Sequence, residues 1–222
     1  MGNNFITAFL PCRKGSQRVP RKNIRNFANH RYGLIELKIN QLIKTKSINS
    51  IILSTNDQDI INYTRKVNNE KIKLDIRKDS LCESTTSTDE LINYVKELIP
   101  FGHILWTHVT APFFNEQDYD KSIRLYNSVL EKGFDSLMTS TVLNTFLWYK
   151  QKPINYDRSI EKWPRTQTLE PVHEINSAVF IASSEIYSSI NDRIGLNPFL
   201  YEIDKIKGFD IDIEEDFYIA EK

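Results

Sequence analysis

Apolar segments of strand length alternate with amphipathic segments of helical length along most of this 222-residue chain. This alternation predicts an α/β fold with a mostly parallel sheet flanked by helices. Helix-capping and turn-forming residues separate the segments, which supports the same interpretation. Hydrophobic residues make up 40% of the chain and aromatic residues 11%, enough for a packed core. At this length we expect a single domain spanning residues 1–222.

The expected strands are short and apolar, at residues 5–10, 50–54, 72–76, 103–108 and 134–141. Two expected helices cover residues 33–46, where Ile35, Ile39, Leu42 and Ile43 share one face, and residues 57–68. A third helix begins at a capping box formed by Ser87 and Glu90. A fourth is capped by Asn115 and ends near Gly133.

Residues 142–175 break this alternation. The segment contains Trp148, Trp163, Tyr149 and Tyr156 but has neither strand nor helix periodicity. We therefore expect an inserted arm rather than a further domain. Its aromatic residues either cover the core locally or form a contact between subunits, and on the second interpretation we expect a homodimer.

Composition excludes several classes of function. The 29 basic and 29 acidic residues cancel, and the isoelectric point is near 6.9, so a nucleic-acid partner is not expected. The sequence shows neither a membrane span nor a secretory signal, and no membrane partner is expected. Two cysteines far apart make neither a disulfide framework nor a zinc knuckle. These features favour a cytoplasmic location.

The loop after the first expected strand concentrates positive charge. Residues 11–23 contain Gly15, two prolines and five cations, namely Arg13, Lys14, Arg18, Arg21 and Lys22. Ligands bind at the carboxyl ends of strands in open α/β sheets, so this loop is expected to bind a polyanion. It lacks the glycine spacing of the Walker A and dinucleotide loops. Side chains should therefore hold the phosphates, with Arg13 able to bind bidentately. The alternative is a solvated basic loop.

Paired carboxylates near the carboxyl terminus form the second candidate site. On an expected strand, Asp210 and Asp212 would share one face while Ile211 points to the opposite layer. Two carboxylates this close repel unless a cation lies between them, and Mg²⁺ is the usual cation beside nucleotide phosphates. The alternative is a solvated edge strand that leads into a helix N-cap.

Residues 13–23, Arg-Lys-Gly-Ser-Gln-Arg-Val-Pro-Arg-Lys-Asn, resemble the signature loop of the acylneuraminate cytidylyltransferase family, which activates acidic sugars with CTP. Cys12 and Gln17 depart from the family's usual Ala and Lys. The family's carboxyl-terminal metal motif is matched by Asp210, Asp212, Asp216, Ala220 and Glu221. The resemblance implies a nucleotide-diphospho-sugar transferase fold, a Rossmann-like three-layer sandwich. It also implies that the arm at 142–175 forms a dimer contact and covers the acceptor site.

The resemblance also implies roles for individual residues. The implied nucleotide-binding residues are Arg13, Lys14, Gly15, Ser16, Lys22, Asn23, His108 and Thr110. The implied acceptor-binding residues are Arg165 and Asn176, and the implied catalytic residues are Arg13, Lys22, Asp210 and Asp212, the last two as ligands of Mg²⁺. His108 stands where the family has Gln, and Glu174 replaces an Arg found in sialate-activating relatives.

These features together predict a CTP-dependent cytidylyltransferase. Its acceptor would be a small acidic sugar, sialic-acid-like or another 2-keto-3-deoxy sugar acid, and its products a CMP-sugar and pyrophosphate. One alternative is a cytidylyltransferase that acts on a phosphate or phosphonate acceptor. Others are a nucleotide-sugar glycosyltransferase with an Asp-x-Asp pair and a non-catalytic nucleotide-binding protein.

Overall fold

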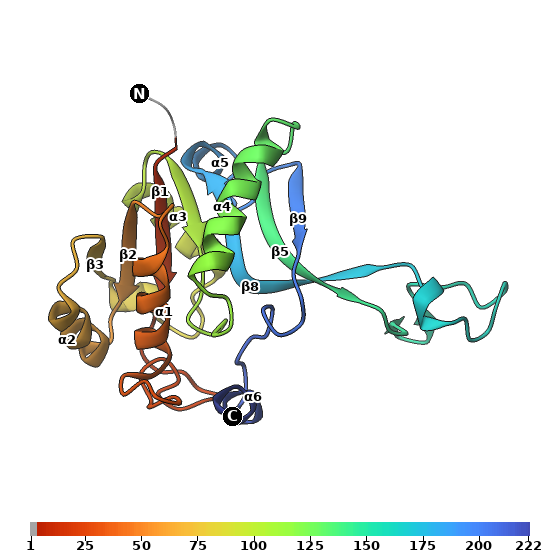
Figure 1. Cartoon of the computed structure of the whole chain (residues 1–222), viewed down its shortest axis with the longest axis horizontal. Coiled ribbons are helices and arrows are strands. Elements are labelled where there is room, and N and C mark those ends of the chain that lie inside the picture. The colour runs from red at the N-terminus through yellow and green to blue at the C-terminus, as the bar shows by residue number, and fades with distance from the viewer. Residues whose placement is uncertain (1–3) are drawn as a thin grey trace.

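The computed structural model describes residues 4–222, which form a seven-stranded sheet with the strand order β3-β2-β1-β4-β8-β5-β9 (Figure 1). Its strands are β1 (Ile6–Pro11), β2 (Ser50–Thr55), β3 (Ile72–Ile76), β4 (His103–Trp106), β5 (Ser136–Leu143), β8 (Val172–Ser183) and β9 (Pro198–Glu202). A separate two-stranded ribbon pairs β6 (Trp148–Tyr149) with β7 (Lys152–Pro153).

The helices follow the predicted caps closely. They are α1 (Gly33–Lys44), α2 (Gln58–Val67), α3 (Thr88–Leu98), α4 (Glu116–Leu130), α5 (Ser184–Ser189) and α6 (Glu214–Glu221), with short 3₁₀ turns η1 (Asp79–Leu81) and η2 (Thr166–Thr168). Ser87 and Glu90 form the predicted capping box of α3, and Asn115 caps α4. All four predicted helices are therefore present, although α1 ends two residues early.

The sheet is mostly parallel, as predicted. Strand β1 pairs in parallel with β2 and β4, β2 with β3, and β5 with β9. Strand β8 is antiparallel to both β4 and β5, between which it lies. The sequence analysis did not predict β8. The first residues of this strand, 172–175, lie inside the segment that was interpreted as an aperiodic arm.

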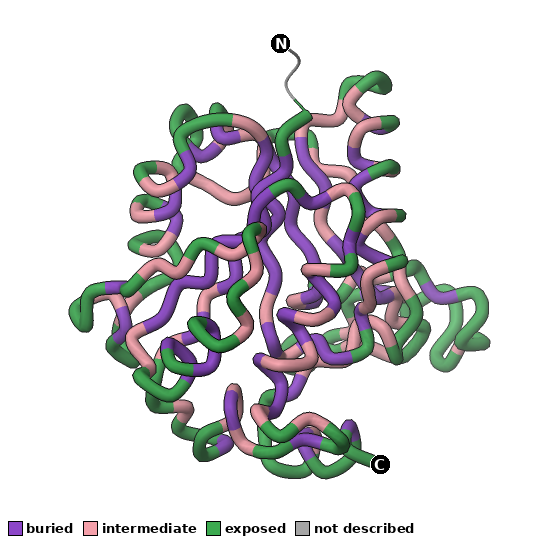
Figure 2. Tube along the Cα trace, turned by 60° about the vertical axis from the view of Figure 1, so that its left-hand side comes forward, coloured by how far each residue is buried: buried purple, intermediate pink, exposed green. Residues whose placement is uncertain are grey.

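Helices cover both faces of the sheet. Side chains such as Leu34 and Ile39 of α1 and Tyr119 of α4 pack with β1 on one face. On the other face, Val95 of α3 and Tyr187 of α5 pack with β4 and β8. The strands consequently form the buried centre of Figure 2. No helix among residues 4–222 has both the length and the apolar composition needed to cross a membrane.

The carboxyl end of β5 and the amino end of β8 extend away from the body of the molecule, and the segment between them projects outward (Figure 1). In this arm the rings of Phe146 and Trp163 lie 5.3 Å apart, and Trp148 Nε1 donates a hydrogen bond of 3.0 Å to the Tyr156 hydroxyl. Trp148 is still 41% exposed and Trp163 62% exposed. The arm's aromatic residues thus pack on one another, and the homodimer contact stays a prediction.

Helix α6 packs on the loop that follows β1. Glu214 forms an ion pair of 2.9 Å with Arg25, the rings of Phe217 and Phe27 lie 5.2 Å apart, and Glu221 accepts a hydrogen bond from the Ala28 amide. This docking brings the carboxyl terminus to the end of the sheet where β1 terminates (Figure 1).

The prediction of a strand at residues 210–212 is wrong. The chain there has no regular secondary structure, and its hydrogen bonds go elsewhere. The Ile211 amide donates to the Thr110 carbonyl at 2.9 Å, and the Asp212 amide donates to the Asp216 carboxylate at 2.9 Å. Capping of α6 therefore replaces the strand ladder, although Ile211 is fully buried as expected.

Candidate functional site

The basic loop leaves β1 at the carboxyl edge of the sheet and is anchored to the end of β2. The Cys12 amide donates to the Ser54 carbonyl at 2.8 Å, and Thr55 Oγ1 donates to the Cys12 carbonyl at 2.5 Å. The Lys14 amide donates to Asn56 Oδ1 at 2.9 Å. Residues 54–56, at the end of β2 and just before α2, therefore fix the neighbouring loop.

Within the loop, Gly15 has a φ of +81°, a conformation that residues with a side chain rarely adopt. Asn23 Nδ2 donates to the Arg13 carbonyl at 3.2 Å, which ties the end of the loop back to its start. These two features shape a turn in which three of the five cations, Arg13, Arg18 and Lys22, face a common space.

That space is a cavity of about 430 Å³, called here the basic cavity. Six of the eight residues implied for nucleotide binding line it, namely Arg13, Ser16, Lys22, Asn23, His108 and Thr110. Lys14 and Gly15 lie on the exposed part of the loop, outside the lining residues. The lining of the basic cavity also includes Gln17, Arg18 and Ser84.

His108 forms one wall of the basic cavity and is neutral. Burial, with the positive charges of Arg193, Lys22 and Lys38, lowers its pKa to about 3. Trp106 Nε1 donates to His108 Nε2 at 2.9 Å. The neutral ring therefore carries its hydrogen on Nδ1 and has one N–H donor left for a ligand.

A second cavity of about 460 Å³, called here the acidic cavity, is lined by residues of β5, β8 and the carboxyl-terminal segment. Glu174, Asp210, Asp212 and Asp216 contribute four carboxylates to its lining, and Lys205 contributes one ammonium. This excess of negative charge favours a bound cation beside any anionic ligand.

The two residues implied for acceptor binding lie in different places. Asn176 lines the acidic cavity, where its Oδ1 accepts from Thr139 Oγ1 at 2.7 Å and its Nδ2 donates to Thr141 Oγ1 at 3.2 Å. Arg165 precedes η2 on the arm and lines neither cavity. The fold of one chain therefore does not bring these two residues together.

Three contacts join the two cavities. Lys22 Nζ donates to the Ile211 carbonyl at 2.7 Å, Arg18 Nη2 lies 2.9 Å from Asp212 Oδ1, and the Ile211 amide bonds Thr110. Burial lowers the pKa of the Lys22 ammonium, while the charges of Asp210 and Asp212 act in the opposite direction. The cations of the basic cavity and the carboxylates of the acidic cavity therefore meet at residues 210–212.

Asp210 and Asp212 fit the ligand set of a hard divalent cation. Oδ1 of Asp210 is buried without a hydrogen-bond partner among residues 4–222, which favours a cation beside it. Burial raises the pKa of Asp210, and hydrogen bonds from Thr110 and Ser177 oppose that shift. Within the same residues, His, Cys, Asp and Glu form no metal-binding group of three or more. Mg²⁺ would therefore take its remaining ligands from phosphate oxygens and water, as it commonly does.

The sequence analysis missed one cation at this edge and the partner of a second. Arg18 was counted in the basic loop but not as the ion-pair partner of Asp212. Arg77 follows β3 and is buried; its Nε donates to Cys82 Sγ at 3.1 Å, and its Nη1 has no hydrogen-bond partner in the described chain. Its position directly after a strand, at the edge where ligands bind, was the signal that could have identified it.

Comparisons with known proteins agree with this geometry. Two pseudaminic acid cytidylyltransferases of Campylobacter jejuni, from serotypes O:2 and O:23/36, are 27% and 28% identical to the chain over 124 residues. This alignment covers 52% of the chain and 52% of each relative, so the chain spans about half the length of the curated relatives it matches.

Solved structures share the fold. A CMP:2-keto-3-deoxy-manno-octonic acid synthetase complexed with CTP superposes with a TM-score of 0.66 at 12% identity, over 98% of this chain and 97% of the other. A 4-diphosphocytidyl-2C-methyl-D-erythritol synthase from Anaerococcus prevotii superposes with a TM-score of 0.67 at 16% identity, over 99% of this chain and 95% of the other. The predicted nucleotide-diphospho-sugar transferase fold is thereby confirmed. A family model described as cytidylyltransferase matches residues 7–185, from β1 into α5, and the chain therefore belongs to the cytidylyltransferase family.

Proposed function

We propose that the protein transfers a cytidylyl group from CTP to an acidic sugar, sialic-acid-like or another 2-keto-3-deoxy sugar acid, and releases pyrophosphate. The observation that carries this proposal is the direct junction of the basic cavity and the acidic cavity at Lys22, Ile211 and Asp212. A triphosphate needs cations around its leaving end and a shielded position for attack at its α-phosphorus. Family membership and the likeness to pseudaminic acid cytidylyltransferases support the choice of donor and acceptor class.

The basic cavity holds the nucleotide in this proposal. Arg13 offers a planar fork to phosphate oxygens, and Lys22 offers a point charge at the junction with the acidic cavity. Thr110 and the Nδ1–H of His108 lie beside them for the remainder of the nucleotide. The cations neutralise the negative charge that gathers on the β- and γ-phosphates as the bond to the α-phosphorus breaks.

Asp210 and Asp212 would hold Mg²⁺, which when bound supplies positive charge to the phosphate oxygens. The acceptor hydroxyl oxygen forms the new bond to the α-phosphorus, the bond from that phosphorus to the bridging oxygen breaks, and the hydroxyl proton is released to solvent. The chain's own contribution is to align the two reactants at residues 210–212 and to shield the buried Oδ1 of Asp210 from water.

The acceptor occupies the acidic cavity in this proposal. Asn176 and Lys205 offer it polar contacts, while Glu174 selects against a second negative charge at that wall. Arg165 lies on the arm, so its proposed role in acceptor binding requires the predicted homodimer to bring an arm over a cavity.

The proposal is tested with the purified chain, Mg²⁺, each of the four ribonucleoside triphosphates and a panel of acceptors. The panel holds 2-keto-3-deoxy sugar acids, sugar phosphates and phosphonates, and pyrophosphate release and the nucleotide product are measured together. We expect pyrophosphate only with CTP and a sugar acid. Turnover with a phosphate or phosphonate instead would establish the alternative acceptor, and CTP binding without pyrophosphate would establish a non-catalytic protein. Turnover of a nucleotide sugar would indicate a glycosyltransferase.

A further inference from the structure

Helix α1 carries a lysine that is fully buried. Nζ of Lys38 donates to the Ala111 carbonyl at 2.7 Å, to the Phe114 carbonyl at 3.1 Å and to the Tyr119 hydroxyl at 2.8 Å. These three partners match the three N–H donors of an ammonium group. Burial is nevertheless costly for this charge and lowers the Lys38 pKa to about 7.

A second side chain of α1 holds the same turn. Gln41 lies three residues after Lys38, on the same face of the helix, and its Nε2 donates to the Pro112 carbonyl at 2.8 Å. Together the two side chains bind three carbonyl groups of residues 111–114. This turn directly follows Thr110, which lines the basic cavity and bonds Ile211.

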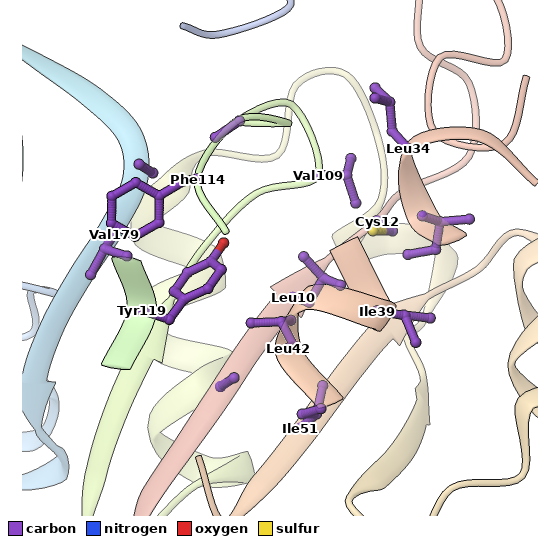
Figure 3. Packing of buried hydrophobic residues seen from close by; sticks show 14 of the residues in the cluster. Leu10, Cys12, Leu34, Ile39, Leu42, Ile51, Val109, Phe114, Tyr119 and Val179 are labelled. Atoms are coloured by element: carbon purple, nitrogen blue, oxygen red, sulfur yellow. The ribbon is translucent and has the colours of Figure 1, made fainter. Parts of the chain in front are cut away.

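The contacts of Lys38 continue through the core to the acidic cavity. Thr107 Oγ1 donates to the Ala178 carbonyl at 2.7 Å, so the Tyr119 hydroxyl donates to Thr107 at 2.7 Å and accepts from Lys38. Figure 3 shows the hydroxyl of Tyr119 within the packed core, with Phe114 nearby. Thr107 immediately precedes His108, and the Ala178 amide donates at 3.3 Å to Oδ1 of Asn176, which lines the acidic cavity. One buried network thus reaches the supports of both cavities.

We propose that Lys38 is a positioning residue for nucleotide binding, acting with Gln41 to fix the turn at residues 111–114 that directly follows His108 and Thr110. A well-packed apolar side chain at position 38 would avoid the desolvation cost of the ammonium, so stability alone does not account for this lysine. What an apolar side chain lacks is the set of donors that holds the carbonyls of Ala111 and Phe114 in one arrangement. The inference rests on the proposed use of CTP at the basic cavity.

The test compares Lys38→Met and Gln41→Met with Ile39→Ala, a buried change in the same helix that touches none of the turn's carbonyls. We expect Lys38→Met to raise the KM for CTP by about tenfold or more and Gln41→Met by about threefold. The KM for the acceptor should change by less than about twofold in both variants, because Lys38 and Gln41 hold the nucleotide turn directly and reach the acidic cavity only through Tyr119 and Thr107. Ile39→Ala should destabilise the fold but leave the KM for CTP within about twofold of wild type.

Kinetics are measured well below each variant's melting temperature, and calorimetry gives the Kd for CTP without any acceptor. If Lys38→Met does not fold, Gln41→Met carries the comparison. Unchanged CTP affinity in the folded variants, or an equal loss in Ile39→Ala, would overturn the positioning role. Wild-type protein that binds CTP but never turns it over would contradict the proposed function alone, since the calorimetric comparison still tests Lys38.

Discussion

The ammonium of Lys22 lies 2.7 Å from the carbonyl oxygen of Ile211, a contact between residues 189 positions apart in the chain. Ile211 stands between the two carboxylates proposed to hold Mg²⁺, and Lys22 lines the cavity proposed to hold the triphosphate. The contact therefore sets the distance between the cationic loop and the acidic segment. It depends on α6, whose Phe217 and Glu214 dock on the loop that carries Lys22.

We expect Asp212→Asn to remove most Mg²⁺-dependent turnover, by about a hundredfold or more, because it deletes one charge of the proposed metal site. Folding should be nearly unaffected, since the lost ion pair with Arg18 is exposed. Pyrophosphate release against Mg²⁺ concentration and a thermal melt measure the two effects. Asp59→Asn, which breaks an exposed ion pair of the same 2.9 Å length with Arg21 outside both cavities, is the matched control. Near-normal turnover in Asp212→Asn would show that Asp212 is not a metal ligand.

Arg13→Ala should reduce kcat/KM for CTP by a few orders of magnitude, because losing a bidentate contact to phosphate costs about 2–5 kcal/mol. The KM for the acceptor should change little, and Arg13→Lys should recover part of the loss, since an ammonium cannot reproduce the planar fork. The control is Arg21→Ala in the same loop, whose guanidinium binds Asp59 at 2.9 Å outside the basic cavity. An effect confined to the acceptor KM would assign the loop to the sugar instead.

His108 should make the protein less stable in acid. Its pKa is about 3 in the folded chain and near 6.5 when unfolded, so between these pH values the unfolded chain binds more protons. The free energy of unfolding therefore falls as pH decreases through this window, by about 2 kcal/mol between pH 7 and pH 5 from this group. Urea titrations at both pH values measure the effect. The same loss in His108→Gln, which cannot titrate, would show that other groups cause it.

The protein is expected to be a homodimer, because the arm exposes apolar surface. Trp148, Tyr149 and Trp163 remain accessible on it, as does Ile160, which is 86% exposed. Burying such side chains between subunits would offset the entropy of association. Light scattering should give twice the mass of one chain at micromolar concentration. The double variant Ile160→Asp with Trp163→Ser should lower the measured mass toward that of a single chain. A wild-type monomer across that range would contradict the prediction.

Local sequence patterns determined much of the fold and the identity of the two charged segments. The strands from β1 to β5 and the helices from α1 to α4 follow from periodicity and capping, since apolar spacing and caps such as Asn115 act within a few residues. The basic loop and the Asp210–Asp212 pair could be identified as candidate sites for the same reason. Charge of one sign in a short segment already implies an oppositely charged partner.

Tertiary structure decided where these segments meet and which residues support them. Nothing local predicts that β8 enters antiparallel between β4 and β5, or that residues 210–212 leave the sheet to cap α6. Lys38 reads in the sequence as an ordinary polar position of a helix, and only packing against α4 and the turn at 111–114 buries it. The physical reason is that pairing and burial depend on contacts between distant residues, whose free energy exceeds the local preferences that periodicity records.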